Sequence, residues 1–554
     1  MSQVNGGKLV VDALKREGVE YIFSLSGGHI NPIYEACAVE GIKVIDTRHE
    51  QAAAHMAEAW GRLTLKPGVC VVTAGPGFTD AITGVANAHM AASPMLIISG
   101  RSGVSETETL ALQELEQIEI IRPLVKWAQV VYETKRIDEF VAMAFRHAMT
   151  GRPGPVFLEI PVDVINKQVD ESEVVRPRGY RPEFKPGGSI EGLQKAIDML
   201  SEAKSPAIFA GSGVYYAQGG TELKEFADLT GIPVFTNNMG RGILADDDPC
   251  CMGSALGGLA TLGSTDLIMV LGARLSFMLL QGRPPLIPAE AKVIQVDIEG
   301  SEIGRNRPID LGLVGDAREI LKELIQLAKE RTWSFTQWKD SLRKNVEDTS
   351  KAMIDGMTRN KDLIHPLDLM LEINDFLDRD AIVVGDGGDT QVWTMMGRKV
   401  YEPGHYLGSG MFGCLGIGIP FGLAAKLRYP EKQVLVTMGD GSAGLNLMEF
   451  NTAVRFNIPI VMVVCNDCSW GMIRHGQRMT FKNGQVVGCE LGQVAYDKVV
   501  ESLEGYGETV SRKEDIKPAL KRAFDSKQPA CINVYVDPEP VSMGSLMLAS
   551  VGTE

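Results

Sequence analysis

The stretch Val434-Leu435-Val436-Thr437-Met438-Gly439-Asp440-Gly441-Ser442 decides the fold. A β-prone run leads directly into a Gly-Asp-Gly turn, as expected of a buried parallel strand that is followed by a helix. Backbone N–H groups at such a turn can bind anionic oxygens, and a carboxylate there can bind a hard divalent cation. Taken alone, the stretch also fits a plain βαβ turn with glycine at positive φ and aspartate as a helix cap.

Nine further runs of this kind occur along the chain. They are rich in Val and Ile and mostly continuous, which is typical of parallel strands covered on both faces. The runs are Val69–Thr73, Met95–Ser99, Val156–Ile160, Ala207–Ala210, Leu267–Leu271, Val293–Ile298, Ile382–Val384, Ile460–Val464 and Ile532–Val536. Helical patterns between them include Glu191–Ala203, Glu222–Thr230 and Glu514–Ser526. This alternation predicts an α/β protein with doubly wound parallel sheets.

Two polar stretches divide the pattern. The first, 166–188, is rich in proline, and the second, 331–361, is charged and helical. Domains usually have about 100–200 residues, so a chain of 554 residues favours three. We therefore expect three α/β domains, at 1–165, 190–330 and 362–554.

The composition excludes several classes of protein. The net charge of −15 argues against a protein that binds the phosphate backbone of nucleic acids. No apolar run reaches the roughly 18 residues of a membrane span, and the first eight residues contain no apolar signal core. We expect a cytoplasmic protein with a small-molecule substrate, and neither nucleic acid nor membrane as a partner. The nine cysteines read as buried thiols rather than a disulfide framework, with a redox or metal pair at Cys465 and Cys468 as the alternative.

A second motif narrows the chemistry expected at Gly439–Ser442. Asn466-Asp467 follows Gly441 after 24 residues. A Gly-Asp-Gly turn followed at this distance by a pair of Asn-type residues resembles the thiamine-diphosphate fingerprint. The resemblance implies that Asp440, Asp467 and the carbonyl of Ser469 bind Mg²⁺. Family members carry Asn where this chain has Asp467, which keeps the oxygen ligand and adds a negative charge.

The resemblance implies further cofactor contacts. The turn Gly385–Thr390 follows another predicted strand and is expected on the far side of the diphosphate, with a plain glycine-rich turn as the alternative. Leu415 aligns with the bulky residue that props the two cofactor rings apart. The cofactor-binding residues are expected to be Gly388, Asp389, Thr390, Gly413, Leu415, Gly439, Asp440, Gly441, Ser442, Asp467, Ser469, Trp470 and Gly471.

Glu50 is expected to activate the cofactor. Thiamine chemistry needs a carboxylate against N1′ of the aminopyrimidine, because proton sharing there lets the 4′-imino group take the C2 proton and generate the ylide. The resemblance places Glu50 in this role, ahead of Ala52–Ala57, which looks like a helix of mainly small residues. The alternative is a surface glutamate stabilised by the dipole of a helix start.

The whole chain resembles the pyruvate-oxidase-like group, which includes acetolactate synthase, benzaldehyde lyase, oxalyl-CoA decarboxylase and 2-hydroxyacyl-CoA lyase. The N-terminal motifs are most similar to benzaldehyde lyase; they are Gly27–Ile30, Ile45–Glu50, Thr73–Gly75 and Thr109–Gln113. The resemblance implies that His29 relays protons, that Gln113 hydrogen-bonds the substrate, and that Gly28 leaves room beside the cofactor. A satisfied core histidine and an exposed helix glutamine are the alternatives for His29 and Gln113.

The expected substrate pocket differs from that of benzaldehyde lyase. Val162, Gln391 and Ser409 stand where that enzyme has aromatic or imidazole side chains, so a smaller or more polar substrate is expected. Leu112 is expected to line the same pocket. Glu490 lies in a segment expected to fold over the site, where it would act as a second acid or base, or else is a solvated loop charge.

The middle domain is expected to be Rossmann-like and resembles that of the CoA-binding lyases and decarboxylases in Gly211–Gln218 and Gly272–Phe277. In those relatives the domain holds the ADP part of CoA, and in acetolactate synthases it holds FAD. Glycines of this kind do not identify the ligand. CoA or ADP, FAD, and an empty structural domain all stay open.

These expectations combine into one hypothesis. The chain is expected to be a thiamine-diphosphate- and Mg²⁺-dependent carbon–carbon lyase or carboligase for acyloins or 2-hydroxyacyl-CoA. The alternatives are a 2-oxo acid decarboxylase or acetolactate synthase, for which we identify no cation aimed at a substrate carboxylate, and a non-catalytic binding protein on the same fold. The resemblance implies a homodimer or homotetramer, with thiamine-diphosphate-binding folds at both ends of the chain meeting across subunit interfaces.

Overall fold

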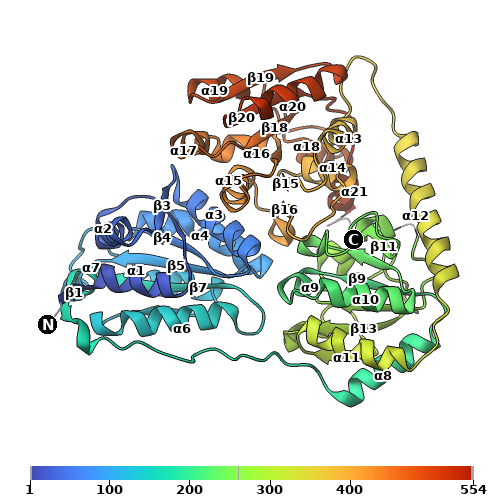
Figure 1. The fold of residues 1–554 in the computed structure, drawn as a ribbon. Helices are drawn as coiled ribbons and strands as arrows, with labels where there is room; N and C mark the ends of the chain where they lie inside the picture. Colours follow the sequence, from blue (N-terminus) through green and yellow to red (C-terminus); the bar gives the residue numbers. More distant parts are fainter. Residues whose placement is uncertain (1–2, 260, 551–554) are drawn as a thin grey trace.

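Three six-stranded sheets form the core of the protein, which is described by a computed structural model at residues 3–259 and 261–550. Figure 1 shows them as three α/β bodies that follow one another along the chain, from blue through green to red. Every strand pairing within these three sheets is parallel, and helices connect the strands. The predicted α/β class with three doubly wound parallel sheets is confirmed.

The N-terminal sheet has the order β3-β2-β4-β5-β7-β6. Its strands are β2 (Tyr21–Ser24), β3 (Lys43–Asp46), β4 (Gly68–Val72), β5 (Met95–Arg101), β6 (Ala128–Val130) and β7 (Pro155–Pro161). Val69 and Val71 of β4 pack with one hydrophobic cluster, and Cys70 and Val72 pack with another. Helices α1 (Gly6–Arg16), α2 (Asn31–Glu40) and α6 (Ile137–Met149) supply the first cluster, whereas α3 (Glu50–Thr64) and α4 (Pro76–Ala91) supply the second. Because both faces are covered, these strands read as continuous apolar runs.

The C-terminal sheet repeats this topology, in the order β16-β15-β17-β18-β20-β19. Its strands are β15 (Ile382–Gly385), β16 (Tyr406–Gly408), β17 (Val434–Gly439), β18 (Val461–Asn466), β19 (Tyr506–Val510) and β20 (Ala530–Tyr535). Counted within each sheet in chain order, both end sheets have the order 2-1-3-4-6-5. The two ends of the chain therefore share one fold without an evident sequence repeat.

The middle sheet is different and has the order β11-β10-β9-β12-β13-β14. Its strands are β9 (Pro206–Ala210), β10 (Val234–Thr236), β11 (Cys251–Ser254), β12 (Leu267–Leu271), β13 (Lys292–Asp297) and β14 (Leu311–Val314). Counted in chain order this is 3-2-1-4-5-6, the order of Rossmann folds. The predicted Rossmann-like middle part is confirmed.

All ten predicted apolar runs are strands, with ends that differ by up to two residues. The remaining strands of the three sheets were not predicted, because most of them are short or only half-buried, as in β3 and β14. The predicted helices are found as α8 (Ile190–Glu202), α10 (Gly220–Thr230) and α20 (Ile516–Asp525).

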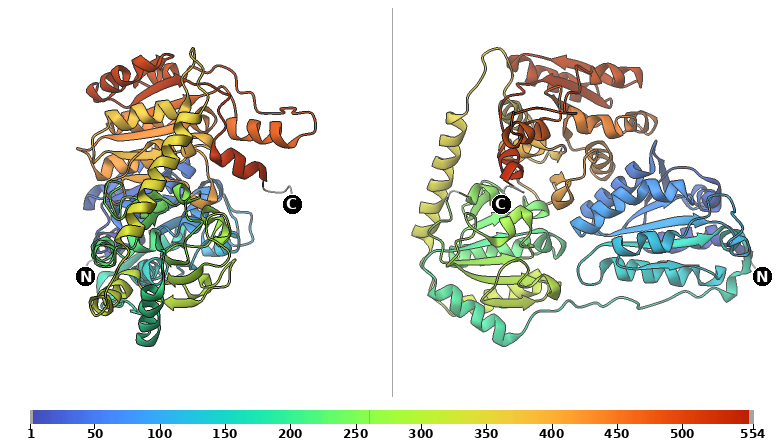
Figure 2. Two further views of the ribbon diagram at one scale, coloured as in Figure 1. Left: turned by 90° about the vertical axis from the view of Figure 1, so that its right-hand side faces the viewer. Right: turned by 180° about the vertical axis from the view of Figure 1, so that it is seen from behind.

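The two polar stretches connect the three bodies. The charged stretch contains α12 (Thr336–Gly356), the long yellow helix beside the middle and C-terminal bodies in Figures 1 and 2. The proline-rich stretch runs from the N-terminal to the middle body and begins with β8 (Gln168–Asp170), which pairs antiparallel with β1 (Gln3–Asn5).

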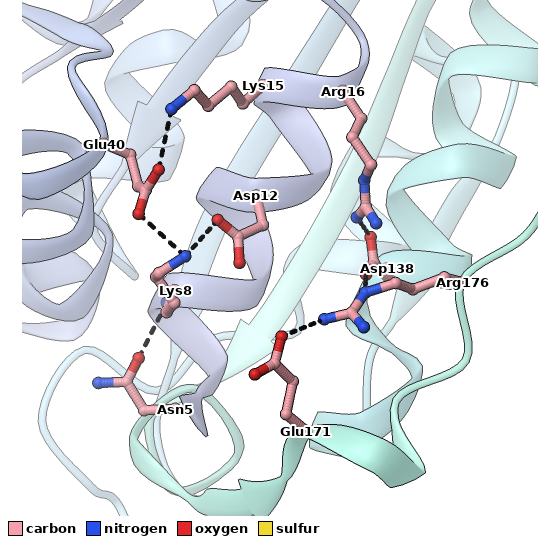
Figure 3. A network of polar contacts seen from close by, with 9 residues as sticks. All are labelled: Asn5, Lys8, Asp12, Lys15, Arg16, Glu40, Asp138, Glu171 and Arg176. Carbon is pink, nitrogen blue, oxygen red and sulfur yellow. Dashed lines mark hydrogen bonds and ion pairs between the residues drawn. The ribbon is translucent and has the colours of Figure 1, made fainter. Parts of the chain in front are cut away.

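A polar network fastens this connection to the N-terminal body. Figure 3 shows Asp138 of α6 between two arginines, Arg16 of α1 and Arg176 of the connection. Asp138 is buried, so its ion pairs are less screened than those at the surface. Arg176 also pairs with Glu171, at 2.9 Å.

The structure also describes the state of the cysteines and the apolar character of the helices. The nine cysteines are free thiols, and eight of them are buried. Among residues 3–259 and 261–550, no helix has the length and apolar character that crossing a bilayer requires.

Candidate active site

The Gly-Asp-Gly turn lies where β17 ends and α16 (Asp440–Asn446) begins. Asp440 is buried, and within the described residues its Oδ2 has no hydrogen-bond partner. Burial and the neighbouring carboxylate of Asp467 raise the pKa of Asp440. A buried carboxyl group whose charge is disfavoured by burial and by a second carboxylate beside it is suited to a divalent cation, which would stabilise both groups as anions.

The loop after β18 aims Asp467 at this position. Asn466 faces away from the carboxylates, because its side chain donates to Asn533 at 2.9 Å and accepts from the N–H of Cys468 at 3.1 Å. The N–H of Ser469 donates to Asp467 at 3.1 Å. Of the predicted Asn-type pair, it is therefore the second residue that lies beside Asp440.

Glycines keep this site open. A Cβ atom at Gly471 would lie 2.4 Å from Oδ2 of Asp467, and one at Gly441 would lie 2.4 Å from the ring of Trp470. The ring therefore covers the turn closely, and the first residue of α18 (Gly471–Thr480) must be small for Asp467 to keep its position.

A cavity of about 370 Å³ extends from the turn. Every cofactor-binding residue predicted from the sequence lines it, together with Gln391 and Ser409; these residues are Gly388, Asp389, Thr390, Gly413, Leu415, Gly439, Asp440, Gly441, Ser442, Asp467, Ser469, Trp470 and Gly471. The hydroxyl of Ser409 donates to Oε1 of Gln391 at 3.1 Å. The described lining contains neither Lys nor Arg, so a diphosphate here would rely on backbone N–H groups and a bound cation.

The far wall of this cavity is built by the turn after β15. Asp389 is the first residue of α14 (Asp389–Gly397), and the hydroxyl of Ser545 donates to it at 2.7 Å. Asp386 is fully buried and accepts from the N–H of Gly418 at 2.7 Å, which fixes the loop that carries Leu415. Burial raises the pKa of Asp386 to about 7.

Glu50 lies in a second cavity, of about 520 Å³, in the N-terminal body. It is the first residue of α3, and His49 caps the helix by accepting from the N–H of Gln51 at 3.1 Å. Only 8% of Glu50 is exposed, and burial raises its pKa. A carboxyl group that is easily protonated suits proton sharing with a ring nitrogen.

The predicted partners of Glu50 line the same cavity. Nδ1 of His29 lies 3.1 Å from Oγ1 of Thr73, and this hydroxyl donates to Oε1 of Gln113 at 3.4 Å. Burial lowers the pKa of His29, which favours the neutral imidazole. Gln113 lies in a loop at φ +60°, not on a helix.

The remaining predicted residues are split. Gly28, Leu112 and Val162 line the Glu50 cavity, and a Cβ atom at Gly28 would meet no atom within 4 Å. Glu490 is exposed and lines neither of these two cavities, although its backbone pairs with that of Ser469. Its role as an acid or base stays a prediction.

Helix α3 connects the two regions. Glu50 is at its start, and the buried ion pair of Glu58 and Arg62 is near its end. Nη1 of Arg62 donates to the carbonyl of Gly408 at 2.8 Å, beside Ser409. Nε2 of His55 lies 3.7 Å from Sγ of Cys414, beside Leu415. The helix that presents Glu50 therefore also supports two loops of the C-terminal cavity.

Two residues of this region had no predicted role. Thr73 stands in a motif quoted above, but nothing local indicated its contacts with His29 and Gln113. Glu449, the first residue of α17 (Glu449–Arg455), accepts from the N–H of Arg48 at 2.9 Å and so fixes the loop before Glu50. This pair is separated by 401 positions, and no local sequence pattern points to it.

A third cavity, of about 510 Å³, lies in the middle body. It opens where the loops after β9 and β12 diverge, at Gly211–Gly213 and Gly272–Arg274, which is the switch point where Rossmann folds bind nucleotides. A Cβ atom at Gly213 would lie 2.6 Å from Cα of Gly272, so the two loops touch. Burial and the nearby Arg152 lower the pKa of Arg274 in this cavity.

Comparisons with known proteins agree with this architecture. Three family models match in order: the thiamine pyrophosphate enzyme N-terminal TPP binding domain at 4–120, the central domain at 193–324 and the C-terminal TPP binding domain at 386–534. The cavity residues Glu50 and Asp440 fall within the first and the last match.

Curated relatives match over nearly the whole chain. A probable acetolactate synthase of Mycobacterium bovis is 33% identical over 539 residues, which cover 97% of this chain and 96% of the relative. Human 2-hydroxyacyl-CoA lyase 1 is 31% identical over 559 residues, 97% of this chain and 95% of the relative. The 2-hydroxyacyl-CoA lyase 2 of Caenorhabditis elegans is 32% identical over 599 residues, with coverage of 98% and 91%. The chain thus belongs to the thiamine pyrophosphate enzyme family.

Proposed function

We propose that this thiamine diphosphate enzyme is an Mg²⁺-dependent carbon–carbon lyase or carboligase for 2-hydroxy carbonyl compounds, either free acyloins or 2-hydroxyacyl-CoA thioesters. The observation that carries the proposal is the Glu50 cavity. Among the described residues that line it, there is neither Lys nor Arg, whereas His29 and Gln113 supply a proton acceptor and a hydrogen-bond donor. A site for a 2-oxo acid would need a cation for the substrate carboxylate.

Each residue has a role in this proposal. The bound cofactor supplies a nucleophilic carbon and an electron sink. Glu50 shares a proton with the pyrimidine ring, His29 moves the proton of the substrate oxygen, and Gln113 orients that oxygen. Asp440, Asp467 and the carbonyl of Ser469 hold Mg²⁺. Two carboxylates and a carbonyl are oxygen ligands, which Mg²⁺ prefers.

We further propose that the active site is completed between subunits of a homodimer or homotetramer. The described linings of the Glu50 and Asp440 cavities share no residue within one chain. One chain supplies Glu50 with His29, and the other supplies the metal and diphosphate site, so a monomer would hold two half-sites. The domain boundaries at 1–165, 190–330 and 362–554 and the cytoplasmic location stay predictions.

For the middle domain we propose a nucleotide ligand, the ADP part of CoA or FAD. The support is the switch-point cavity with Gly211–Gly213 and Arg274. A CoA thioester would make this domain part of substrate binding. FAD would agree with the resemblance to acetolactate synthases. The acetolactate synthase relatives favour 2-oxo acid chemistry as the second candidate function.

A substrate panel tests the proposal. Protein loaded with thiamine diphosphate and Mg²⁺ is given acyloins, a 2-hydroxyacyl-CoA, aldehydes and pyruvate, and both CO₂ and aldehyde products are measured. We expect aldehyde release from a 2-hydroxy compound without CO₂. If pyruvate yields CO₂ and acetolactate and no 2-hydroxy compound is cleaved, the proposal is wrong and the acetolactate synthase hypothesis takes its place.

A further inference from the structure

Thr73 lies between His29 and Gln113 but has no role in the proposal so far. It directly follows β4 and is buried at 7% exposure. Its hydroxyl oxygen is within hydrogen-bond distance of both Nδ1 of His29 and Oε1 of Gln113. It is therefore the one described residue that is hydrogen-bonded to both groups expected to touch the substrate.

Packing fixes the orientation of this hydroxyl. A Cβ atom at Gly27 would lie 2.3 Å from Cβ of Thr73, and one at Gly77 would lie 2.7 Å from its methyl group. The chain thus approaches Thr73 closely on two sides where only glycine fits. A β-branched side chain has few χ1 states even without such walls. The close backbone and the β-branch together restrict the directions in which the hydroxyl can point.

The hydroxyl carries one proton, and this sets the direction of the hydrogen bonds. Because Thr73 donates to Oε1 of Gln113, its oxygen is left to accept from His29. The proton of the neutral imidazole is then on Nδ1, and Nε2 keeps its lone pair. With Oε1 turned to Thr73, the N–H₂ group of Gln113 is the part available to the cavity that it lines.

We propose that Thr73 is a positioning residue that holds His29 in the Nδ1-protonated tautomer and Gln113 with its amide N–H₂ toward the substrate. This inference rests on the proposed function. In the cleavage direction Nε2 takes the proton of the substrate hydroxyl, and the O–H bond breaks as the N–H bond forms. The pair left on oxygen becomes the second bond of the released carbonyl, and the pair of the broken carbon–carbon bond stays on the carbon that remains enzyme-bound.

Two substitutions separate the hydroxyl from the shape of the side chain. Thr73→Val keeps both branches and removes the hydroxyl, whereas Thr73→Ser keeps the hydroxyl. A positioned general base contributes roughly 10²–10⁴-fold to the rate. We expect Thr73→Val to lower kcat by roughly 10- to 100-fold, with KM close to wild type, and Thr73→Ser to recover most of that loss. Thr79→Val is the matched control, since Thr79 is exposed on α4 and its hydroxyl donates to the carbonyl of Pro76.

The tautomer itself is measured by ¹⁵N NMR of histidine-labelled holoenzyme, with His29→Asn to assign the signal. We expect an Nδ1–H signature in wild type and Thr79→Val and a mixture in Thr73→Val. An unchanged signature together with unchanged kcat in Thr73→Val would overturn the inference. An enzyme that cleaves no 2-hydroxy compound but shows the expected signatures would refute the proposed function and still establish that Thr73 sets the tautomer.

Discussion

The N-terminal and C-terminal sheets have the same strand order, yet the carboxyl groups in their cavities suit different tasks. Each cavity opens between the loops that follow the first and third strands of its sheet, β2 with β4 and β15 with β17. This is the switch point at which doubly wound sheets bind ligands. The topology therefore fixes where a ligand binds, and the loop residues fix what is bound.

The carboxyl groups of the two cavities show the difference. Asp440 and Asp467 lie together, so each is disfavoured as an anion by burial and, for Asp440, by its neighbour as well. For Glu50, burial is the main cause of the raised pKa, and the carboxylate of Asp80 adds a smaller contribution. The first arrangement calls for a cation and the second for a proton. The two end sheets thus share one strand order, and each carries one half of the chemistry that we propose.

The largest expected effect tests this division directly. Asp440→Ala removes a ligand that we propose for Mg²⁺, so we expect loss of detectable binding of thiamine diphosphate with Mg²⁺. Glu50→Gln keeps the shape and removes the shared proton, so we expect near-normal binding but a kcat lower by roughly 10²–10⁴-fold. Isothermal titration calorimetry with each variant, alongside single-turnover rates, separates the two. Loss of cofactor binding in both variants would contradict the proposed difference between the Asp440 and Glu50 cavities.

Mixing these variants tests whether the two cavities belong to different subunits. Each variant alone is expected to be nearly inactive. After denaturation and joint refolding of equal amounts, half of the dimers are mixed, and each mixed dimer contains one site built from two intact halves. We expect recovery of about a quarter of wild-type activity. Activity that stays at the level of the separate variants would place both halves of a site in one chain.

A smaller effect is expected from Gly471. The added methyl group of Gly471→Ala would lie 2.4 Å from Oδ2 of Asp467 and displace that carboxylate. Changes beside metal ligands cost roughly 10- to 100-fold in metal affinity, and we expect a loss of that size for Mg²⁺ with little change at the Glu50 cavity. Gly476→Ala is the control on the same helix, because a Cβ atom there meets nothing within 4 Å. Equal Mg²⁺ affinities for the two variants would contradict the cramped position of Asp467.

The smallest effect concerns the contact between the two bodies at Glu449. Burial raises the pKa of this carboxyl from 4.5 to about 7. The folded state therefore holds the proton more tightly than the unfolded state, and the resulting stability is present below about pH 4.5 and is lost as the pH rises through 7. We expect the melting temperature to fall by a few degrees more between pH 5 and 8 in wild type than in Glu449→Gln. Parallel pH profiles of the two proteins would show that Glu449 does not titrate in this range.

The sequence was most informative where the pattern is local. The buried runs before Gly439 and Thr73 identify strands because both faces are covered, and the 24-residue spacing to Asn466-Asp467 reflects one helical crossover between neighbouring strands. Contacts that depend on loop conformation were not predictable. Gln113 reaches Thr73 because it adopts φ +60°, which no residue type there requires. The contact of Glu449 with the loop before Glu50 exists only once two separate sheets have packed.

Helix α3 connects the N-terminal and C-terminal cavities of one chain mechanically. Its 15 residues span about 22 Å. Glu50 at one end faces the N-terminal cavity, while Arg62 at the other braces Gly408 beside the C-terminal cavity of the same chain. In the subunit arrangement proposed above these cavities belong to two different active sites. Helix α3 would then contact two active sites. A tilt of the helix that accompanies ligand binding at one site would change the ligand affinity of the other.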